Sequence, residues 1–226
     1  MYVIYIQAMI KTIPNILAWS SNDFALQLTR LADFEVIDID ITVVPFADKN
    51  TVSVKESISM LASRKLAISF HLMEVEPIDS INLILKSGLN IDQIFIHQEA
   101  DLTRVEGLPR NVQEKIGITI KRETKLKDIK FYNNYSSIQL MTGIFAGQGS
   151  VFDEEALAKS LALRSMGFEG EIGIDGGVNL NTAKIIKDYP IDRVSLGSYI
   201  HKSKNPMLDI MKLNLALNMR TVEESY

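Results

Sequence analysis

The chain contains no cysteine, which excludes disulfide bonds and thiolate metal ligands. A protein without disulfides is compatible with a reducing compartment, so we expect it to be cytoplasmic. The chain also has no excess of basic residues, because 24 Lys and Arg stand against 28 Asp and Glu. A net charge of −4 does not favour a nucleic-acid surface, which is normally basic, so we expect no nucleic-acid partner.

Long hydrophobic runs and linker-like segments are missing as well. No apolar run reaches the roughly 20 residues that cross a bilayer, so no membrane partner is expected. The apolar N-terminus, MYVIYIQAMI, lacks a basic region and a small-residue cleavage site, and it is better interpreted as a strand than as a signal peptide. We therefore predict a single domain over residues 1–226, with a polar tail at 219–226.

Short apolar segments alternate with longer amphipathic stretches along the whole chain. Eight segments are predicted strands: Val3–Met9, Glu35–Thr42, Leu66–Met73, Gln93–His97, Ile116–Ile120, Ser137–Thr142, Glu171–Ile174 and Arg193–Leu196. The region Lys11–Asp33 is ambiguous, because its helix could start near Pro14 or at a second cap within Ser20–Asp23. Strand–helix alternation predicts a parallel sheet, and eight repeats of this size favour an α/β fold of the (β/α)8 TIM barrel type. A doubly wound open sheet is the alternative.

Polar residues stand at the ends of several predicted strands, where a barrel collects its chemistry. Asp38 and Asp40 lie two residues apart and so share one face of their strand, while His71 lies near the end of a second strand and Asp175 directly follows a third. Carboxylates in a confined space repel one another unless a cation or a shared proton intervenes. These four residues are candidate ligands of one divalent metal ion, with Zn²⁺, Mn²⁺ or Fe²⁺ favoured over Ca²⁺. An Asp at a strand end can equally be a turn or helix cap.

Two segments near the C-terminus end in small residues after an apolar run. They read IGIDGGVN, from Ile172, and VSLGSYI, from Val194. Glycine lets a backbone approach an anion closely, and free N–H groups then bind it. These strand ends predict a phosphate site beside Asp175 and hence chemistry on a phosphorylated small molecule.

The motifs together resemble the ribulose-phosphate 3-epimerase family, whose members are metal-dependent (β/α)8 barrels. The resemblance runs from about Val36 to about Ile200. The segments that carry it are FHLMEVEP (70–77), IFIHQEADL (94–102), GITIKRETKL (117–126), QLMTGIFAGQGSVF (139–152), IGIDGGVN and LGSYI. These motifs, five when IGIDGGVN and LGSYI are counted as one, stand in the right order and are together far more specific than any one of them.

The resemblance implies a role for each matching residue. Asp40 matches an Asp that is both metal ligand and acid/base, His71 matches a metal-binding His, and Asp175 matches the second catalytic Asp, which is also a ligand. Asp38 stands where the family has its first metal-binding His. The positions around the substrate phosphate are matched by Gly147, Gly176, Gly177, Gly197 and Ser198.

The implied activity is that of an isomerase acting on carbohydrate phosphates. It is a sugar-phosphate 3-epimerase that moves a proton at C3 of a phosphorylated ketose, such as ribulose 5-phosphate, with one divalent metal ion. Two other readings stay open: a lyase or aldolase with Lys121 as a Schiff base, and a non-catalytic barrel that binds a phosphometabolite. Exposed helix faces would also permit a homo-oligomer.

The chain departs from the family pattern in the residues that would face the substrate. The family's Met-Asp-Gly after Asp40 is replaced in Thr42–Phe46, and its Asn-Pro after the fifth strand is replaced by Lys121-Arg122, which could accept an extra anionic group. Pro14–Leu17 looks like the family's Pro-Ser-Ile-Leu, but its spacing to the second strand is too short. The strand-1 position is therefore expected nearer Gln7–Met9.

Overall fold

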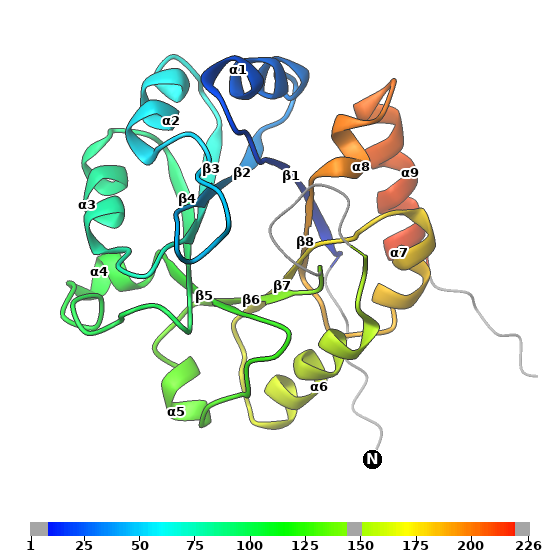
Figure 1. Cartoon of the computed structure of the whole chain (residues 1–226). Helices are drawn as coiled ribbons and strands as arrows, with labels where there is room; N and C mark the ends of the chain where they lie inside the picture. The colour runs from blue at the N-terminus through cyan, green and yellow to red at the C-terminus, as the bar shows by residue number, and fades with distance from the viewer. Residues whose placement is uncertain (1–8, 144–150, 220–226) are drawn as a thin grey trace, which may run out of the picture.

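The chain forms a closed barrel of eight parallel strands in the order of the sequence (Figure 1). The computed structural model describes residues 9–143 and 151–219. Closure confirms the predicted (β/α)8 barrel and excludes the open sheet. The strands are β1 (Lys11–Ile16), β2 (Val36–Thr42), β3 (Ala67–Met73), β4 (Ile91–His97), β5 (Ile116–Ile120), β6 (Ser137–Met141), β7 (Glu171–Asp175) and β8 (Arg193–Leu196).

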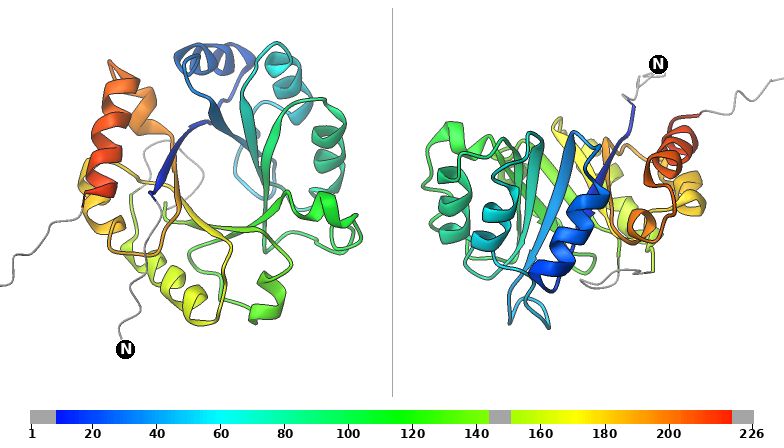
Figure 2. Two further views of the ribbon diagram at one scale, coloured as in Figure 1. Left: turned by 180° about the vertical axis from the view of Figure 1, so that it is seen from behind. Right: turned by 90° about the horizontal axis from the view of Figure 1, so that it is seen from above.

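At least one helix follows each strand and covers the outside of the barrel (Figures 1 and 2). The helices are α1 (Ser21–Arg30), α2 (Val54–Leu61), α3 (Ile78–Lys86), α4 (Arg110–Gln113), α5 (Ile129–Tyr132), the 3₁₀ helix η1 (Glu154–Leu157), α6 (Ala158–Ser165), α7 (Leu180–Ile186), α8 (Ser198–His201) and α9 (Pro206–Asn218). Among the described residues, no helix has both the length and the apolar character needed to cross a bilayer.

The hydrophobic core lies between the strands and the helices. Each strand turns alternate aliphatic residues outward, as Ile37, Ile39 and Ile41 do on β2, and all three are buried in the core. The helices supply the other half through residues such as Phe24 and Leu61. This alternation explains why the predicted strands, Ile- and Val-rich runs, agree with the observed ones from β2 onward.

The first strand is the error in the predicted set. Of Val3–Met9, only Met9 belongs to the described residues, and it is exposed and outside any strand. The barrel strand is instead Lys11–Ile16, which pairs with β2 and β8. Because Pro14 lacks an N–H donor, the segment resembled a helix start rather than a strand.

Two related expectations change with the first strand. The helix begins at Ser21, with Ser20 as its N-cap, so the second of the two candidate caps is the one used. The motif around Asn15 does lie on β1, where Asn15 pairs in register with Asp38. The rejection of Pro14–Leu17 on spacing was therefore wrong. The polar tail predicted at 219–226 lies, beyond Met219, outside the described residues.

The interior of the barrel is polar where many barrels are aliphatic. Many buried positions that point inward are polar or lack a side chain, among them Asn15, Asp38, Asp40, Ser69, His71, His97, Gly117, Thr119, Gln139, Gly173, Asp175 and Arg193. Burying a polar group without a hydrogen bond costs free energy, and several of these side chains bond with one another, as Asn15 does with Asp40 and Arg193 with Asp38. The barrel interior is therefore a network of charges and hydrogen bonds.

We expect Gly117→Ala to destabilise the protein, because Gly117 faces this interior. A Cβ there would lie 2.5 Å from Ser137 Oγ and 2.6 Å from the Phe95 ring. The free energy of unfolding should fall by about 1–3 kcal/mol in urea denaturation. Gly107→Ala is the matched control, because its nearest atom would be at 3.8 Å. Equal stability of the two variants would contradict the packing described.

Candidate active site

Two carboxylates flank one imidazole at the C-terminal end of the barrel. Asp40 and His71 are register partners on β2 and β3, and Asp175 is the last residue of β7. His71 Nδ1 lies 3.4 Å from Asp40 Oδ1 and 3.3 Å from Asp175 Oδ2, and all three residues are buried. The structure thus brings together three of the four residues predicted to bind a metal.

Burial and proximity shift the pKa values of this cluster strongly. Burial, followed by the neighbouring charge of Asp175, raises the pKa of Asp40 to about 7. Burial alone would lower the pKa of His71, but Asp175 and Asp40 outweigh it and raise that pKa to about 9. A carboxylic acid that titrates near neutrality can both accept and release a proton under ordinary conditions.

The donor set fits a divalent cation. Among the described residues, Asp40, His71 and Asp175 form the group whose ligand atoms all lie within 4.8 Å of one another. His71 Nδ1 is buried and makes no hydrogen bond within the described part of the chain, although two carboxylates face it. One imidazole nitrogen with two carboxylates is a ligand set that suits Zn²⁺, Mn²⁺ or Fe²⁺.

Asp38 has another partner and stands apart from this group. Arg193 Nη2 donates to Asp38 Oδ1 at 2.6 Å, and Ser195 Oγ donates to Asp38 Oδ2. Arg193 and Asp38 are both almost fully buried, so this is an internal ion pair. The cluster therefore contains the other three predicted ligands, while the carboxylate of Asp38 is bound by residues of β8.

Asn15 and His97 orient the cluster from two sides. Asn15 Nδ2 donates to Asp40 Oδ2 at 2.9 Å, and His97 Nε2 lies 2.9 Å from His71 Nε2. His97 Nδ1 lies 3.3 Å from Glu99 Oε2, and Thr124 donates to the other oxygen of Glu99. The Glu99 carboxylate can accept only from a protonated His97 Nδ1, so His97 Nε2 accepts from His71. This arrangement leaves His71 Nδ1 facing the carboxylates.

The pKa shifts of the outer pair agree with that assignment. Burial lowers the pKa of His97 to about 4 despite the neighbouring Glu99. The pKa of Glu99 falls to about 2: its burial opposes the shift, but hydrogen bonds from His97 and Thr124 outweigh it. His97 is therefore neutral and Glu99 ionised over the whole physiological range.

Sequence reasoning did not single out Asn15, Arg193 or Ser195. Asn15 does carry a signal, because Pro14–Leu17 resembles a family motif, although its short spacing to the second strand points instead to Gln7–Met9. Arg193 and Ser195 carry no local signal, because their partner Asp38 lies 155 and 157 residues away in the sequence.

The predicted phosphate residues lie near Asp175. Gly176 and Gly177 follow it with left-handed φ values of +112° and +71°, which favour glycine. A Cβ on Gly176 would lie 2.4 Å from the backbone of Gly143, so the turn packs tightly on the loop after β6. Gly197 and Ser198 follow β8, at the same end of the barrel. Phosphate binding by these four stays a prediction, and Gly147 lies outside the described residues.

A cavity of about 510 Å³ opens beside the cluster. It is lined by Trp19, Phe46, Ala47, Asp48, Lys49, Met73, His97, Lys121, Arg122, Glu123, Met141 and Gly143. The loop after β2 reaches this cavity, and Figure 2 (right) shows it projecting beyond the barrel. Thr42 Oγ1 binds the Lys49 carbonyl and Asn50 binds the N–H of Val44, which folds the loop back on itself. The cavity can therefore admit a small molecule to His97 and the residues behind it.

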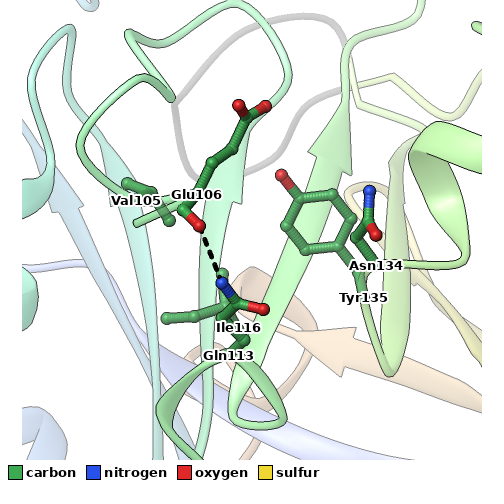
Figure 3. A pocket seen from close by; sticks show the side chains of 6 residues that line it. All are labelled: Val105, Glu106, Gln113, Ile116, Asn134 and Tyr135. Atoms are coloured by element: carbon green, nitrogen blue, oxygen red, sulfur yellow. Dashed lines mark hydrogen bonds between the residues drawn. The ribbon is translucent and has the colours of Figure 1, made fainter. Parts of the chain in front are cut away.

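A second cavity, of about 260 Å³, lies elsewhere in the fold (Figure 3). Ile116 begins β5 and Tyr135 precedes β6, so this cavity lies at the N-terminal end of the strands. Gln113 spans part of it and donates to the Glu106 carbonyl at 2.9 Å. Catalysis in (β/α)8 barrels takes place at the opposite end, so the larger cavity is the candidate active site.

A (β/α)8 barrel with buried acid/base groups at its C-terminal end defines a class of enzyme scaffolds. Within that class, the chain belongs to the Ribulose-phosphate 3 epimerase family, whose sequence profile matches residues 11–201. No curated protein matches the chain.

Several solved structures are similar to this barrel. KGPDC from Streptococcus mutans has 14% identity and a TM-score of 0.66, covering 93% of this chain and 98% of that one. 3-Hexulose-6-phosphate synthase from Salmonella typhimurium has 12% identity and a TM-score of 0.67, covering 92% and 98%. Phosphoribosyl anthranilate isomerase from Thermococcus kodakaraensis has 14% identity and a TM-score of 0.61, covering 94% and 100%. At these identities the likeness shows the fold, and family membership supports a barrel enzyme of sugar-phosphate chemistry.

Removing Arg193 should cost far more stability than removing Asp38. Arg193→Met leaves the buried Asp38 without a cation, which costs about 3–5 kcal/mol. In Asp38→Asn, Arg193 keeps Glu171 at 3.4 Å and Asp92 at 3.6 Å, so the loss should be smaller. The double variant Asp38→Asn/Arg193→Met should recover part of the loss in urea denaturation. Strict additivity of the two single changes would contradict a coupled pair.

The metal-free protein should contain one charged and two neutral histidines at pH 7. The chain has three histidines. His71, with a pKa of about 9, should be the imidazolium, while burial lowers the pKa of both His97 and His201. Imidazole ¹⁵N NMR of the chelator-treated protein measures this directly. Since the pKa of His71 is raised on folding, its contribution to stability should be lost as pH rises from 6.5 towards 9. A neutral His71 at pH 7 would refute the assignment.

Proposed function

We propose that the chain is a sugar-phosphate 3-epimerase, which transfers a proton at C3 of a ketose phosphate between two carboxylates. The observation that carries the proposal is the placement of Asp40 and Asp175 on either side of His71, buried at the C-terminal end of the barrel. Family membership is the independent support. An epimerase needs two acid/base groups, so that one face of the substrate loses a proton and the other face gains one.

Asp40 is suited to exchange a proton with a carbon atom of the substrate at neutral pH. Burial raises its pKa to about 7, so the carboxyl is present in both protonation states. Its second oxygen accepts from Asn15, which leaves the first oxygen facing His71 Nδ1. Asp175 is the second carboxylate, and together the pair removes the C3 proton and returns one to the opposite face.

A divalent ion fits among the donor atoms of Asp40, His71 and Asp175. Such an ion, when bound, supplies Lewis-acid stabilisation of the oxygen charge that develops as the C3 proton leaves. His71 would present Nδ1 to it while donating Nε2–H to His97. The oriented His97 and Glu99 hold that tautomer in place, as the outer partners of metal-binding histidines commonly do.

The substrate's phosphate belongs, in this proposal, at the ends of β7 and β8. Gly176, Gly177, Gly197 and Ser198 lie there, and Gly147 is assigned to the same site on the family resemblance alone. Binding energy at the phosphate would hold C3 between the two carboxylates, so that remote contacts contribute to the rate.

The proposal predicts exchange of solvent deuterium into C3 of a ketose phosphate. Mass spectrometry of ribulose 5-phosphate and other ketose phosphates after incubation in D₂O with Mn²⁺ or Zn²⁺ measures it. Asp40→Asn and Asp175→Asn should each lower exchange by at least about 10³-fold, because each removes one acid/base group. Asp79→Asn is the control, since Asp79 is highly exposed.

Two further outcomes separate the alternatives. Thermal stabilisation by ketose phosphates without any exchange would replace the proposal with non-catalytic binding. Mass gain at Lys121 after borohydride treatment with substrate would favour a Schiff-base lyase or aldolase instead.

A further inference from the structure

The cavity beside the cluster is lined by a cationic side chain that has no role in the proposed proton transfer. Its lining includes the cations Lys49, Lys121 and Arg122 and the carboxylates Asp48 and Glu123. Arg122 Nη1 is already paired, at 3.3 Å, with Asp153. Lys121, in contrast, has no carboxylate within 4.0 Å among the residues that the structure describes. Its Nζ lies instead 4.0 Å from the centroid of the Phe46 ring.

The segment that carries Lys121 is held firmly in place. Lys159, in α6, points its Nζ at three backbone carbonyls, those of Lys121 at 2.6 Å, Arg122 at 2.6 Å and Thr124 at 2.7 Å. The ammonium group of Lys159 thus fixes the turn after β5. A cation on a fixed turn loses less entropy when it binds an anion than a cation on a loose one.

Aromatic rings connect Lys121 to the catalytic cluster. Phe46 meets the His97 ring edge-on, with centroids 4.7 Å apart, and His97 stacks on His71 at 5.0 Å. Lys121 therefore lies beside the same cavity wall that leads to the carboxylates. In the closed barrel, β5 is three strands away from β8, so Lys121 and Ser198 lie on different sides of the mouth.

We infer that Lys121 binds a second anionic group, at the end of the substrate remote from the phosphate. The inference rests on the proposed function, which places the phosphate at β7 and β8 and C3 between Asp40 and Asp175. The substrate class is then a ketose phosphate whose C1 end is itself anionic, as a second phosphate or a carboxylate. An uncompensated ammonium beside an apolar ring suits either group, since Lys acts on anions as a point charge.

Ligand binding and exchange, measured in parallel, test this subsite. The probes are ribulose 5-phosphate, ribulose 1,5-bisphosphate and 2-keto-6-phosphogluconate, whose C1 groups are a hydroxyl, a phosphate and a carboxylate. Titration calorimetry of the metal-loaded protein gives the dissociation constants, and deuterium incorporation reports exchange. We expect at least one doubly anionic ligand to bind about tenfold or more tightly than the monophosphate, the size of one charge-assisted contact.

Lys121 and Lys127 each lie over an aromatic ring, so variants of both show whether the preference for doubly anionic ligands depends on Lys121. Lys127 Nζ lies 3.9 Å from the Phe131 ring, as Lys121 does from Phe46, but Lys127 does not line the cavity. Lys121→Met keeps an apolar contact with Phe46 and should reduce the preference to within about twofold, while Lys127→Met and Lys121→Arg should keep it. A preference that is absent in the parent protein, or that survives Lys121→Met, overturns the inference.

The two proposals fail in different ways. Exchange with ribulose 5-phosphate, without any preference for the doubly anionic ligands, leaves the epimerase standing and removes the subsite. A preference that depends on Lys121, without exchange of any ligand, supports the subsite and removes the epimerase.

Discussion

The structure depends on how the barrel interior compensates its buried negative charge. Asp38, Asp40 and Asp175 all face inward and are all buried. Burying a carboxylate without a partner costs several kcal/mol, so each needs a cation or a proton nearby. Arg193 compensates the charge of Asp38, which lies nearer the N-terminal end of β2 than Asp40 does. His71 lies between Asp40 and Asp175. Because Arg193 pairs with Asp38, Asp40 and Asp175 lie together without an arginine. Two carboxylates placed in this way form a site that can bind a cation or share a proton.

The Arg193–Asp38 ion pair also keeps the charge of Asp38 from adding to that of the Asp40–His71–Asp175 cluster. Asp38 stands where the family resemblance places a metal-binding histidine, yet both of its oxygens accept hydrogen bonds from β8. Gly173 is required beside it, because a Cβ there would lie 2.6 Å from Arg193 Cγ. Arg193 and Gly173 thus accommodate the carboxylate of Asp38 in the barrel interior. This set of residues explains how the chain can carry Asp38 without adding an uncompensated charge to the cluster.

Most of the fold could be predicted from the sequence, because strands of a covered parallel sheet are nearly continuous Ile, Val and Leu runs. The first strand could not, since Pro14 and Asn15 break that pattern and only the closed barrel shows that both positions are tolerated. The proximity of Asp40, His71 and Asp175 was predictable, because each lies toward the C-terminal end of its strand and these ends meet in a barrel. Arg193 and Ser195 were not, because their roles depend on register across the barrel rather than on neighbours in the chain.

Two departures from the family resemblance, in Thr42–Phe46 and at Lys121-Arg122, meet at the candidate substrate cavity. Thr42 binds the Lys49 carbonyl and so shapes the loop that brings Phe46 and Lys49 to the cavity. Lys121 comes from the other changed motif and lies over that same Phe46 ring. Two segments far apart in the sequence therefore meet at one contact, that of Lys121 with the Phe46 ring. Changes in the residues that line a cavity alter which molecule is held there, while Asp40, His71 and Asp175 lie outside that lining.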